Sequence, residues 1–148
     1  MRNIAARQRI CLLLGILALA FIWGNSLQTA EESSAVSGGL LQWFAPIFDG
    51  LGIPEEWQHD LLRKTAHMAE FAALALLWCG ALLNEKRERI WAVLAICVMA
   101  AAVDETIQLF VSGRSGELRD VLIDTAGAAV GTGFAVILRA VGAQRGRK

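Results

Sequence analysis

Four long apolar runs divide this chain and set narrow limits on the folds it can adopt. They occupy residues 10–23, 71–83, 91–103 and 126–138, and each holds thirteen or fourteen residues without a charge. A soluble amphipathic helix keeps a polar stripe along its whole length, and these runs have almost none. Each run can also be extended at one end to about 20 residues, the length that a helix needs to cross a bilayer. The pattern predicts an all-α protein, a bundle of four transmembrane helices.

We expect a single transmembrane domain over residues 1–148, because the length fits one domain and no repeat recurs at a fixed period. With flanking residues included, the predicted spans are 9–27, 62–83, 90–111 and 120–139. The loop at 28–60 is broken by glycines and two prolines, so it is not expected to span the membrane. Either a short helix near 40–48 lies in the membrane interface, or the whole segment is a plain loop.

Basic residues gather at alternate ends of the runs. They precede the first run, follow the fourth, and fill NEKRERI (84–90) between the second and third. The connection between the first and second runs is mostly acidic, as in AEESS and PEEWQHD. Because cytoplasmic loops of membrane proteins are enriched in Lys and Arg, both termini are expected in the cytoplasm. A cleaved signal peptide is the alternative for the N-terminus, but Gln28 would occupy a position that favours a small residue.

The composition indicates which kinds of binding partner to expect. Fourteen basic residues balance fourteen acidic ones, so no basic excess points to a nucleic acid. Membrane lipid is the partner that the apolar runs imply. The three cysteines, Cys11, Cys79 and Cys97, lie inside apolar runs without metal-binding or redox spacing, so we interpret them as small buried apolar residues.

Polar residues continue the predicted helices at one end of every run. These residues are Asn25 and Ser26; Arg63, Lys64, His67 and Glu70; Asp104, Glu105 and Gln108; and Asp120 and Asp124. At 100° per residue, each cluster falls largely on one face of its helix. The basic-loop rule places all of them in the outer half of the membrane. A charge near the bilayer centre costs at least about 2.5–3.5 kcal/mol, so we expect them to face one another in a polar pocket open to the exterior.

The connection SGRSGELRD (112–120) is rich in Gly and Ser, which predicts a tight turn between the third and fourth spans. It would hold Arg114 above the pocket. Together with Arg63 and Lys64, this guanidinium could bind an anionic headgroup.

These motifs match a known family. RKTAHMAEF, followed by DETIQLFVSGRSGELRDVLIDTAGAAVG, resembles the VanZ-like family of bacterial membrane proteins, and WGNSLQTAEESSAVSGG resembles its first span and loop. The resemblance covers the chain from about Trp23 to Gly131. The matching motif positions are Lys64, His67, Glu70, Asp104, Glu105, Gln108, Gly113, Arg114, Asp120, Asp124 and Gly127. The family is named for a teicoplanin-resistance determinant, which implies an antibiotic-resistance-related role at the bacterial inner membrane. It leaves the chemistry open.

Candidate roles follow from residue type. The candidate catalytic residues are His67, Glu70, Asp104, Glu105, Gln108 and Asp124. The candidate substrate-binding residues are Arg63, Lys64, Arg114, Asp120 and Ser26. A divalent metal ion is one cofactor that His67, Glu70, Asp104 and Asp124 could hold. Structural roles compete with each of these: a hydrogen bond that pins two helices, a helix cap at Asp120, or ion pairs between the acids and the basic residues.

Three function classes remain open. The first is a membrane enzyme acting on a lipid-linked or phosphorylated envelope substrate. The second is a protein that binds such a precursor or an antibiotic without turnover. The third is a small ion-coupled transporter, which is disfavoured because a transport path needs polar residues at both depths of the membrane.

Overall fold

The computed structural model describes residues 2–82 and 89–145, with side chains over 4–82 and 89–144. Within these ranges the chain forms helices and no strands, which confirms the all-α prediction. The helices are α1 (Arg2–Ser26), α2 (Ala30–Gly50), α3 (Glu55–Leu82), α4 (Arg89–Gln108) and α5 (Leu118–Arg145). Four of them, all except α2, are long and apolar enough to cross a membrane. Most of the basic 84–90 segment lies outside the described residues.

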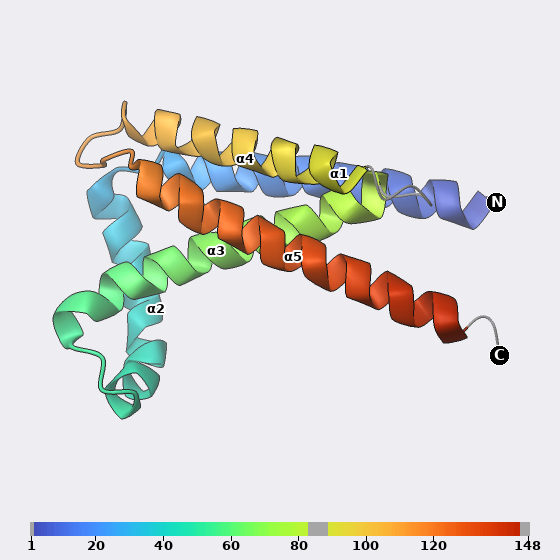
Figure 1. Cartoon of the computed structure of the whole chain (residues 1–148). Helices are drawn as coiled ribbons and strands as arrows, with labels where there is room; N and C mark the ends of the chain where they lie inside the picture. Colours follow the sequence, from blue (N-terminus) through green and yellow to red (C-terminus); the bar gives the residue numbers. More distant parts are fainter. Residues whose placement is uncertain (1, 83–88, 146–148) are drawn as a thin grey trace.

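The four long helices form an elongated bundle that α2 closes at one end. Figure 1 shows α1 and α4 running side by side, α3 and α5 crossing each other, and α2 lying across the bundle. The start of α1 and the end of α5 both lie at the opposite end of the bundle, and the connection between α4 and α5 lies near α2. We call these the terminal end and the α2 end. Four membrane-spanning helices, an even number, require the start of α1 and the end of α5 to lie on the same side of the membrane.

The helix α2 is longer than the short interface helix expected at 40–48. Thr29 caps its start: the Glu32 N–H donates to Thr29 Oγ1 at 3.3 Å, and the Thr29 N–H donates to Glu32 Oε2 at 2.9 Å. This capping box supplies partners for backbone groups that a helix start leaves unpaired. Glycines and Pro46 lie within α2, although the broken sequence had suggested a shorter helix.

Apolar side chains cover the outside of the bundle, as lipid contact requires. On the outer face of α1, Leu13 and Leu17 are more than 60% exposed, and Val130 and Ile137 of α5 are similar. The buried core is thin. It consists of Ile22, Phe71, Leu74, Ala75, Cys79, Val93, Cys97, Ala100, Ala101, Ala128 and Ala135. Two of the three cysteines are buried in it as predicted, and Cys11 is half-buried.

Two glycines bring α5 against the backbone of α3. A Cβ atom added at Gly127 would overlap the Met68 carbonyl oxygen, and one at Gly131 would overlap the Ala72 carbonyl oxygen. The contact is therefore backbone to backbone, as the small-xxx-small spacing indicates. Because Gly127 is one turn after Asp124, the same crossing places that carboxylate beside His67.

The connection between α4 and α5 folds back onto its neighbours. The Ala30 N–H donates to the Ser112 carbonyl at 3.2 Å, which joins the start of α2 to this connection. Gly113 has a φ of 73°, in the left-handed region that glycine adopts without strain. Its Cβ position lies 2.9 Å from the Ala30 Cβ, so the approach also needs a residue without a side chain. These contacts fix Arg114 over the α2 end.

Candidate functional site

Asp104 of α4 is the most enclosed carboxylate of the α2 end. Its side chain is fully buried, the Ser26 hydroxyl donates to Oδ1 at 2.7 Å, and Gln108 Nε2 donates to Oδ2 at 2.9 Å. Ser26 was a candidate substrate-binding residue. The structure instead buries it completely and uses its hydroxyl to hold Asp104.

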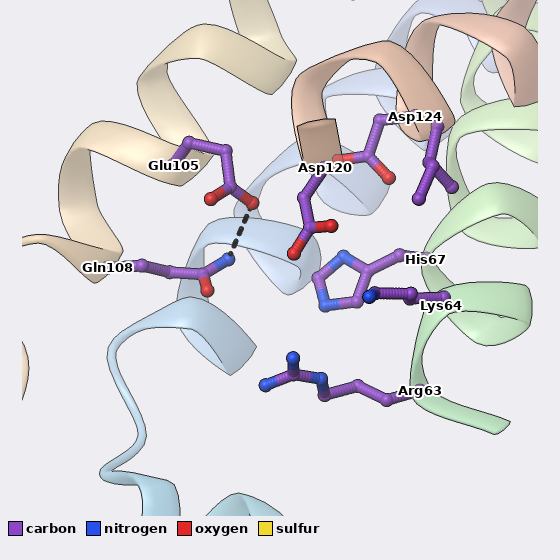
Figure 2. Close-up of a pocket in the computed structure, with 8 residues that line it drawn as sticks. Arg63, Lys64, His67, Glu105, Gln108, Asp120 and Asp124 are labelled. Carbon is purple, nitrogen blue, oxygen red and sulfur yellow. Dashed lines mark hydrogen bonds between the residues drawn. The ribbon is translucent and has the colours of Figure 1, made fainter. Parts of the chain in front are cut away.

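Gln108 connects α4 to the turn that follows it. Its Nε2 also donates to Glu105 Oε1 at 3.2 Å (Figure 2), and its Oε1 accepts from Arg114 Nε at 3.2 Å. Glu105 Oε2 in turn accepts from the Glu117 N–H at 2.8 Å. Gln108 and Glu105 are both candidate catalytic residues. Most of their hydrogen bonds hold the turn and Arg114 in place.

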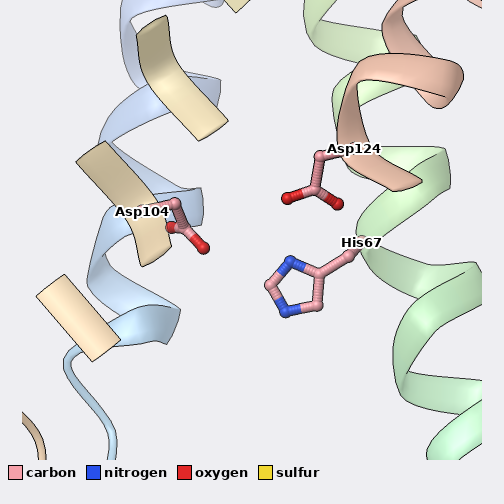
Figure 3. A group of neighbouring side chains, drawn as sticks. All are labelled: His67, Asp104 and Asp124. Carbon is pink, nitrogen blue, oxygen red and sulfur yellow. The ribbon is translucent and has the colours of Figure 1, made fainter. Parts of the chain in front are cut away.

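His67 of α3 and Asp124 of α5 lie next to each other, and Asp104 of α4 lies opposite them (Figure 3). One potential ligand atom from each of the three lies within 4.8 Å of those of the others. Asp124 is 1% exposed, and neither of its carboxylate oxygens has a hydrogen-bond partner among the described residues. His67 Nδ1 is also buried without such a partner.

Glu70, the fourth candidate metal ligand, lies outside this group of three. Its Oε2 is 4.0 Å from His67 Nδ1, and the side chain is about a quarter exposed. It neither belongs to the converging set nor lines the cavity beside it. The structure therefore brings together three of the four candidate ligands and leaves Glu70 as a neighbour of His67.

A small cavity adjoins this group. It is lined by Arg63, Lys64, His67, Glu105, Gln108, Asp120, Ile123 and Asp124 (Figure 2). Its volume of about 10 Å³ is close to the minimum that holds a single water molecule. We call it the inner cavity. A water, an ion or one oxygen of a ligand fits there, whereas a whole headgroup does not.

A second, wider cavity adjoins it, between the start of α2, α3 and the turn after α4. Its volume is about 220 Å³, and it is lined by Ala30, Ser33, Ser34, His59, Asp60, Arg63 and Arg114. We call it the vestibule. Arg63 lines both cavities, so the two adjoin. Sequence reasoning missed Ser33, Ser34 and His59, because nothing in the spacing showed that α2 would fold over the pocket.

The basic residues do not neutralise the buried acids. Arg63 and Lys64 both pair with Asp60, at 3.4 and 2.8 Å. Over residues 4–82 and 89–144, no Lys or Arg nitrogen lies within 4.0 Å of a carboxylate oxygen of Asp104 or Asp124. The ion pairs considered as a structural alternative are thus absent for these two acids. Asp60 was missed as a partner, although its i, i+3 and i, i+4 spacing to the two bases could have indicated it.

Arg114 is half-buried over the pocket and keeps its charge. Burial, and next the nearby Arg63, lower the pKa of the Arg114 guanidinium from its usual value, while the neighbouring acids act in the opposite direction. Guanidinium groups remain protonated in proteins even so. The vestibule is therefore lined by two cations, Arg63 and Arg114, and by one acid, Asp60, which pairs with Arg63.

Comparison with known proteins places the chain in a family. The family model described as VanZ/LLP1 matches residues 11–139, most of the chain. The chain belongs to the VanZ/LLP1 family. The resemblance seen in the motifs is thereby confirmed. No curated protein and no solved structure gave a match.

Membership of the VanZ/LLP1 family and four helices of spanning length together describe a multi-pass membrane protein. The matched range contains every candidate site residue. The converging His67, Asp104 and Asp124 thus lie within the part of the chain that the VanZ/LLP1 family model matches.

Proposed function

We propose that this VanZ/LLP1 protein binds the phosphorylated headgroup of a lipid-linked envelope precursor in the vestibule and acts on it with the groups of the inner cavity. The observation that carries the proposal is that Arg63 and Arg114 line the wide cavity, while Asp124, whose two carboxylate oxygens have no hydrogen-bond partner among the described residues, lines the narrow cavity that adjoins it. The adjoining cavities would place a bound phosphate next to His67 and Asp124.

The vestibule suits a phosphate group by size and by chemistry. A volume of about 220 Å³ accommodates a phosphate or diphosphate, which the inner cavity does not. Arg63 and Arg114 offer planar guanidinium groups, which bind phosphate oxygens through two parallel hydrogen bonds. The Ser33 and Ser34 side chains add hydroxyl donors along the same wall.

His67 and Asp124 supply groups for acid–base chemistry. A catalytic base must have a nitrogen or oxygen free to take a proton, and His67 Nδ1 and both oxygens of Asp124 have no hydrogen-bond partner within the described ranges. In the hydrolysis that we propose, His67 or Asp124 takes a proton from a water molecule, and the oxygen of that water attacks phosphorus. The bond from phosphorus to the lipid oxygen breaks, and that oxygen takes up a proton. The products are a lipid alcohol and inorganic phosphate.

Binding without turnover is the second candidate, and the size of the inner cavity favours it. At about 10 Å³ the cavity admits one small species, so a phosphorus atom held in the vestibule would stay outside it unless the helices moved. The transporter reading gains no support, since the core toward the terminal end is built mainly from apolar residues such as Leu74, Val93 and Cys97.

We further propose that the α2 end faces the outside of a bacterial inner membrane, with both termini in the cytoplasm. The basic residues near the termini support this orientation. Exposed apolar residues Leu40, Trp43 and Ile47 of α2 would then lie in the outer leaflet, where α2 can run along the interface. From this position the protein would meet envelope precursors, which fits the resistance role that the family name implies.

The test is binding of one lipid in two forms to the full chain in nanodiscs. An isoprenoid-chain monophosphate should bind in a one-to-one complex detected by native mass spectrometry, and the matching alcohol should bind at least tenfold more weakly. Arg63→Gln and Arg114→Gln should each weaken phosphate binding by about 10–100-fold, since hydrogen bonds to charged groups contribute about 1.5–3 kcal/mol. Arg119→Gln is the matched control, because Arg119 is exposed at the same end and lines neither cavity.

Equal binding of phosphate and alcohol, or equal effects of Arg114→Gln and Arg119→Gln, would contradict the proposal. Release of inorganic phosphate distinguishes the two candidate functions, an enzyme and a protein that binds without turnover. Turnover that disappears in Asp124→Asn while binding persists identifies an enzyme. Tight binding with no phosphate released in any condition identifies the non-catalytic form.

A further inference from the structure

We propose that His67, Asp104 and Asp124 form a binding site for one divalent metal ion. The three residues come from α3, α4 and α5, so the ion would join three helices at the α2 end (Figure 3). The inference rests on the proposed function in using the same pocket, and it names the cofactor of that site. It stands on four separate observations.

The first observation is the state of Asp124. Its side chain is 1% exposed, and both carboxylate oxygens lack a hydrogen-bond partner in the described part of the chain. Buried polar atoms in proteins are nearly always paired, because an unpaired one costs about 1–3 kcal/mol and a charged one more. An oxygen pair aimed at His67 and Asp104 without a donor is the geometry of a carboxylate that binds a cation.

The second observation is the charge balance. Neither Asp104 nor Asp124 has a basic side chain within ion-pair distance in the described ranges, since Arg63 and Lys64 pair with Asp60. Two buried carboxylates would therefore carry two uncompensated negative charges at membrane depth. A divalent ion bound by two carboxylates and a neutral imidazole has no net charge. The ion would supply the positive charge that no basic side chain of the described ranges provides at this position.

The third observation is the way Asp104 is held. The Ser26 hydroxyl and the Gln108 amide each donate to one of its oxygens, at 2.7 and 2.9 Å. A carboxylate oxygen has two lone pairs, so each oxygen can accept one hydrogen bond and still bind a metal. Hydrogen bonds of this kind orient ligating carboxylates in metal sites. Ser26 and Gln108 are thus positioning residues, and their burial gains a reason.

The fourth observation is distance. Ligand atoms no more than 4.8 Å apart place an ion at their centre within about 2.8 Å of each, by the geometry of a triangle. Zn²⁺ binds nitrogen and oxygen at about 2.0–2.2 Å, so each side chain must move inward by less than about 1 Å. A mixed set of one imidazole and two carboxylates suits Zn²⁺ or Mn²⁺ better than Mg²⁺ or Ca²⁺, which prefer oxygen ligands.

Three protein ligands leave at least one position on the ion open, as in catalytic rather than structural sites. The inner cavity adjoins that position, and it has room for one water molecule or one phosphate oxygen. The open position would therefore connect the metal to whatever occupies the vestibule.

The test is metal binding by the full-length protein in nanodiscs, after removal of metals with a chelator. Calorimetry during titration with Mn²⁺, together with elemental analysis of the bound ion, should show one Mn²⁺ per chain. Added Zn²⁺ should displace it. Asp124→Asn keeps the shape of the side chain and should weaken binding at least about 100-fold. Ser26→Ala should weaken it by about 10–100-fold, as loss of an orienting partner does. Glu56→Gln removes an exposed carboxylate at the start of α3 that lines neither cavity, so its affinity should equal that of the wild type within about threefold.

Absence of a bound ion in the wild-type protein overturns the inference, and so does equal affinity of Asp124→Asn and wild type. If Asp124→Asn fails to fold, His67→Gln provides the same comparison. Binding of the isoprenoid monophosphate is measured in parallel with chelator present. If the metal fails to bind while the phosphate lipid still binds through Arg63 and Arg114, this inference is wrong and the proposed function stands. If the metal binds and the phosphate lipid does not, the proposed function is wrong and the metal site stands.

Discussion

The crossing of α3 and α5 at Gly127 gives the sharpest test of how the pocket is held together. In Gly127→Ala, the new Cβ would overlap the Met68 carbonyl oxygen and lie 2.9 Å from the carbonyl carbon. These atoms belong to helix backbone, which cannot rotate away as a side chain would. The two helices must therefore separate, and His67 on α3 would move away from Asp124 on α5.

The size of the effect follows from two opposing contributions. Overpacking costs about 1–3 kcal/mol, and a backbone contact belongs at the upper end of that range. Replacing a helical Gly by Ala gains up to about 1 kcal/mol. The net loss is about 2 kcal/mol, which corresponds to a fall in Tm of about 4–8 °C for a chain of this length. Affinity for Mn²⁺ should fall with it.

The matched control lies on the same helix. A Cβ added at Gly133 meets no atom within 4 Å, so Gly133→Ala should leave the Tm unchanged or raise it slightly. The assay is thermal unfolding of both variants in nanodiscs, followed by tryptophan fluorescence. If Gly127→Ala and Gly133→Ala unfold at the same temperature as each other, the close crossing does not exist and the geometry of the pocket is wrong.

Three further predictions concern the topology, the second helix and the ligand set. A cysteine placed at Ser115 should react with an impermeant thiol reagent on intact cells and one at Gln144 should not; labelling of both or of Gln144 alone would exclude the proposed orientation. The Thr29 N–H holds the pKa of Glu32 below its usual value of 4.5, so the capping box is complete above that pH and is lost as the pH falls through the lower pKa of the folded state. Protection of the first-turn amides of α2 from hydrogen exchange, taken relative to the intrinsic rate at each pH, should fall over this acidic range, and Thr29→Ala should lack that protection already at neutral pH; full protection in that variant would mean that the cap does not hold the helix. Asp104→Asn should lose the bound Mn²⁺ and Glu70→Gln should keep it, and loss in both would enlarge the ligand set to include Glu70.

Sequence patterns were sufficient for the positions of the polar clusters because few physical rules decide them. The basic segments fix which ends of the runs lie together. Helical periodicity fixes which residues share a face, so His67, Asp104 and Asp124 could be expected at one place. The structure shows this convergence directly.

The distribution of partners within the pocket could not be predicted in the same way. Spacing alone does not decide whether Arg63 pairs with an acid of another helix or with Asp60 one turn away, and the structure shows the latter. The role of Ser26 depends on how closely α1 packs against α4, which no periodicity encodes. The vestibule depends on α2, whose length was underestimated because its glycines and Pro46 suggested a break, whereas the helix runs from Ala30 to Gly50.

In the proposed metal site, three helices meet around one ion that has an imidazole among its ligands. Pulsed electron paramagnetic resonance of Mn²⁺ bound to the protein in nanodiscs tests this directly, because it detects a nitrogen atom bonded to the ion. The chain has two histidines, His59 and His67. We expect coupling to one imidazole nitrogen in the wild type, its persistence in His59→Gln, and its loss in His67→Gln. Bound Mn²⁺ without nitrogen coupling, or coupling that survives in His67→Gln, would contradict the account.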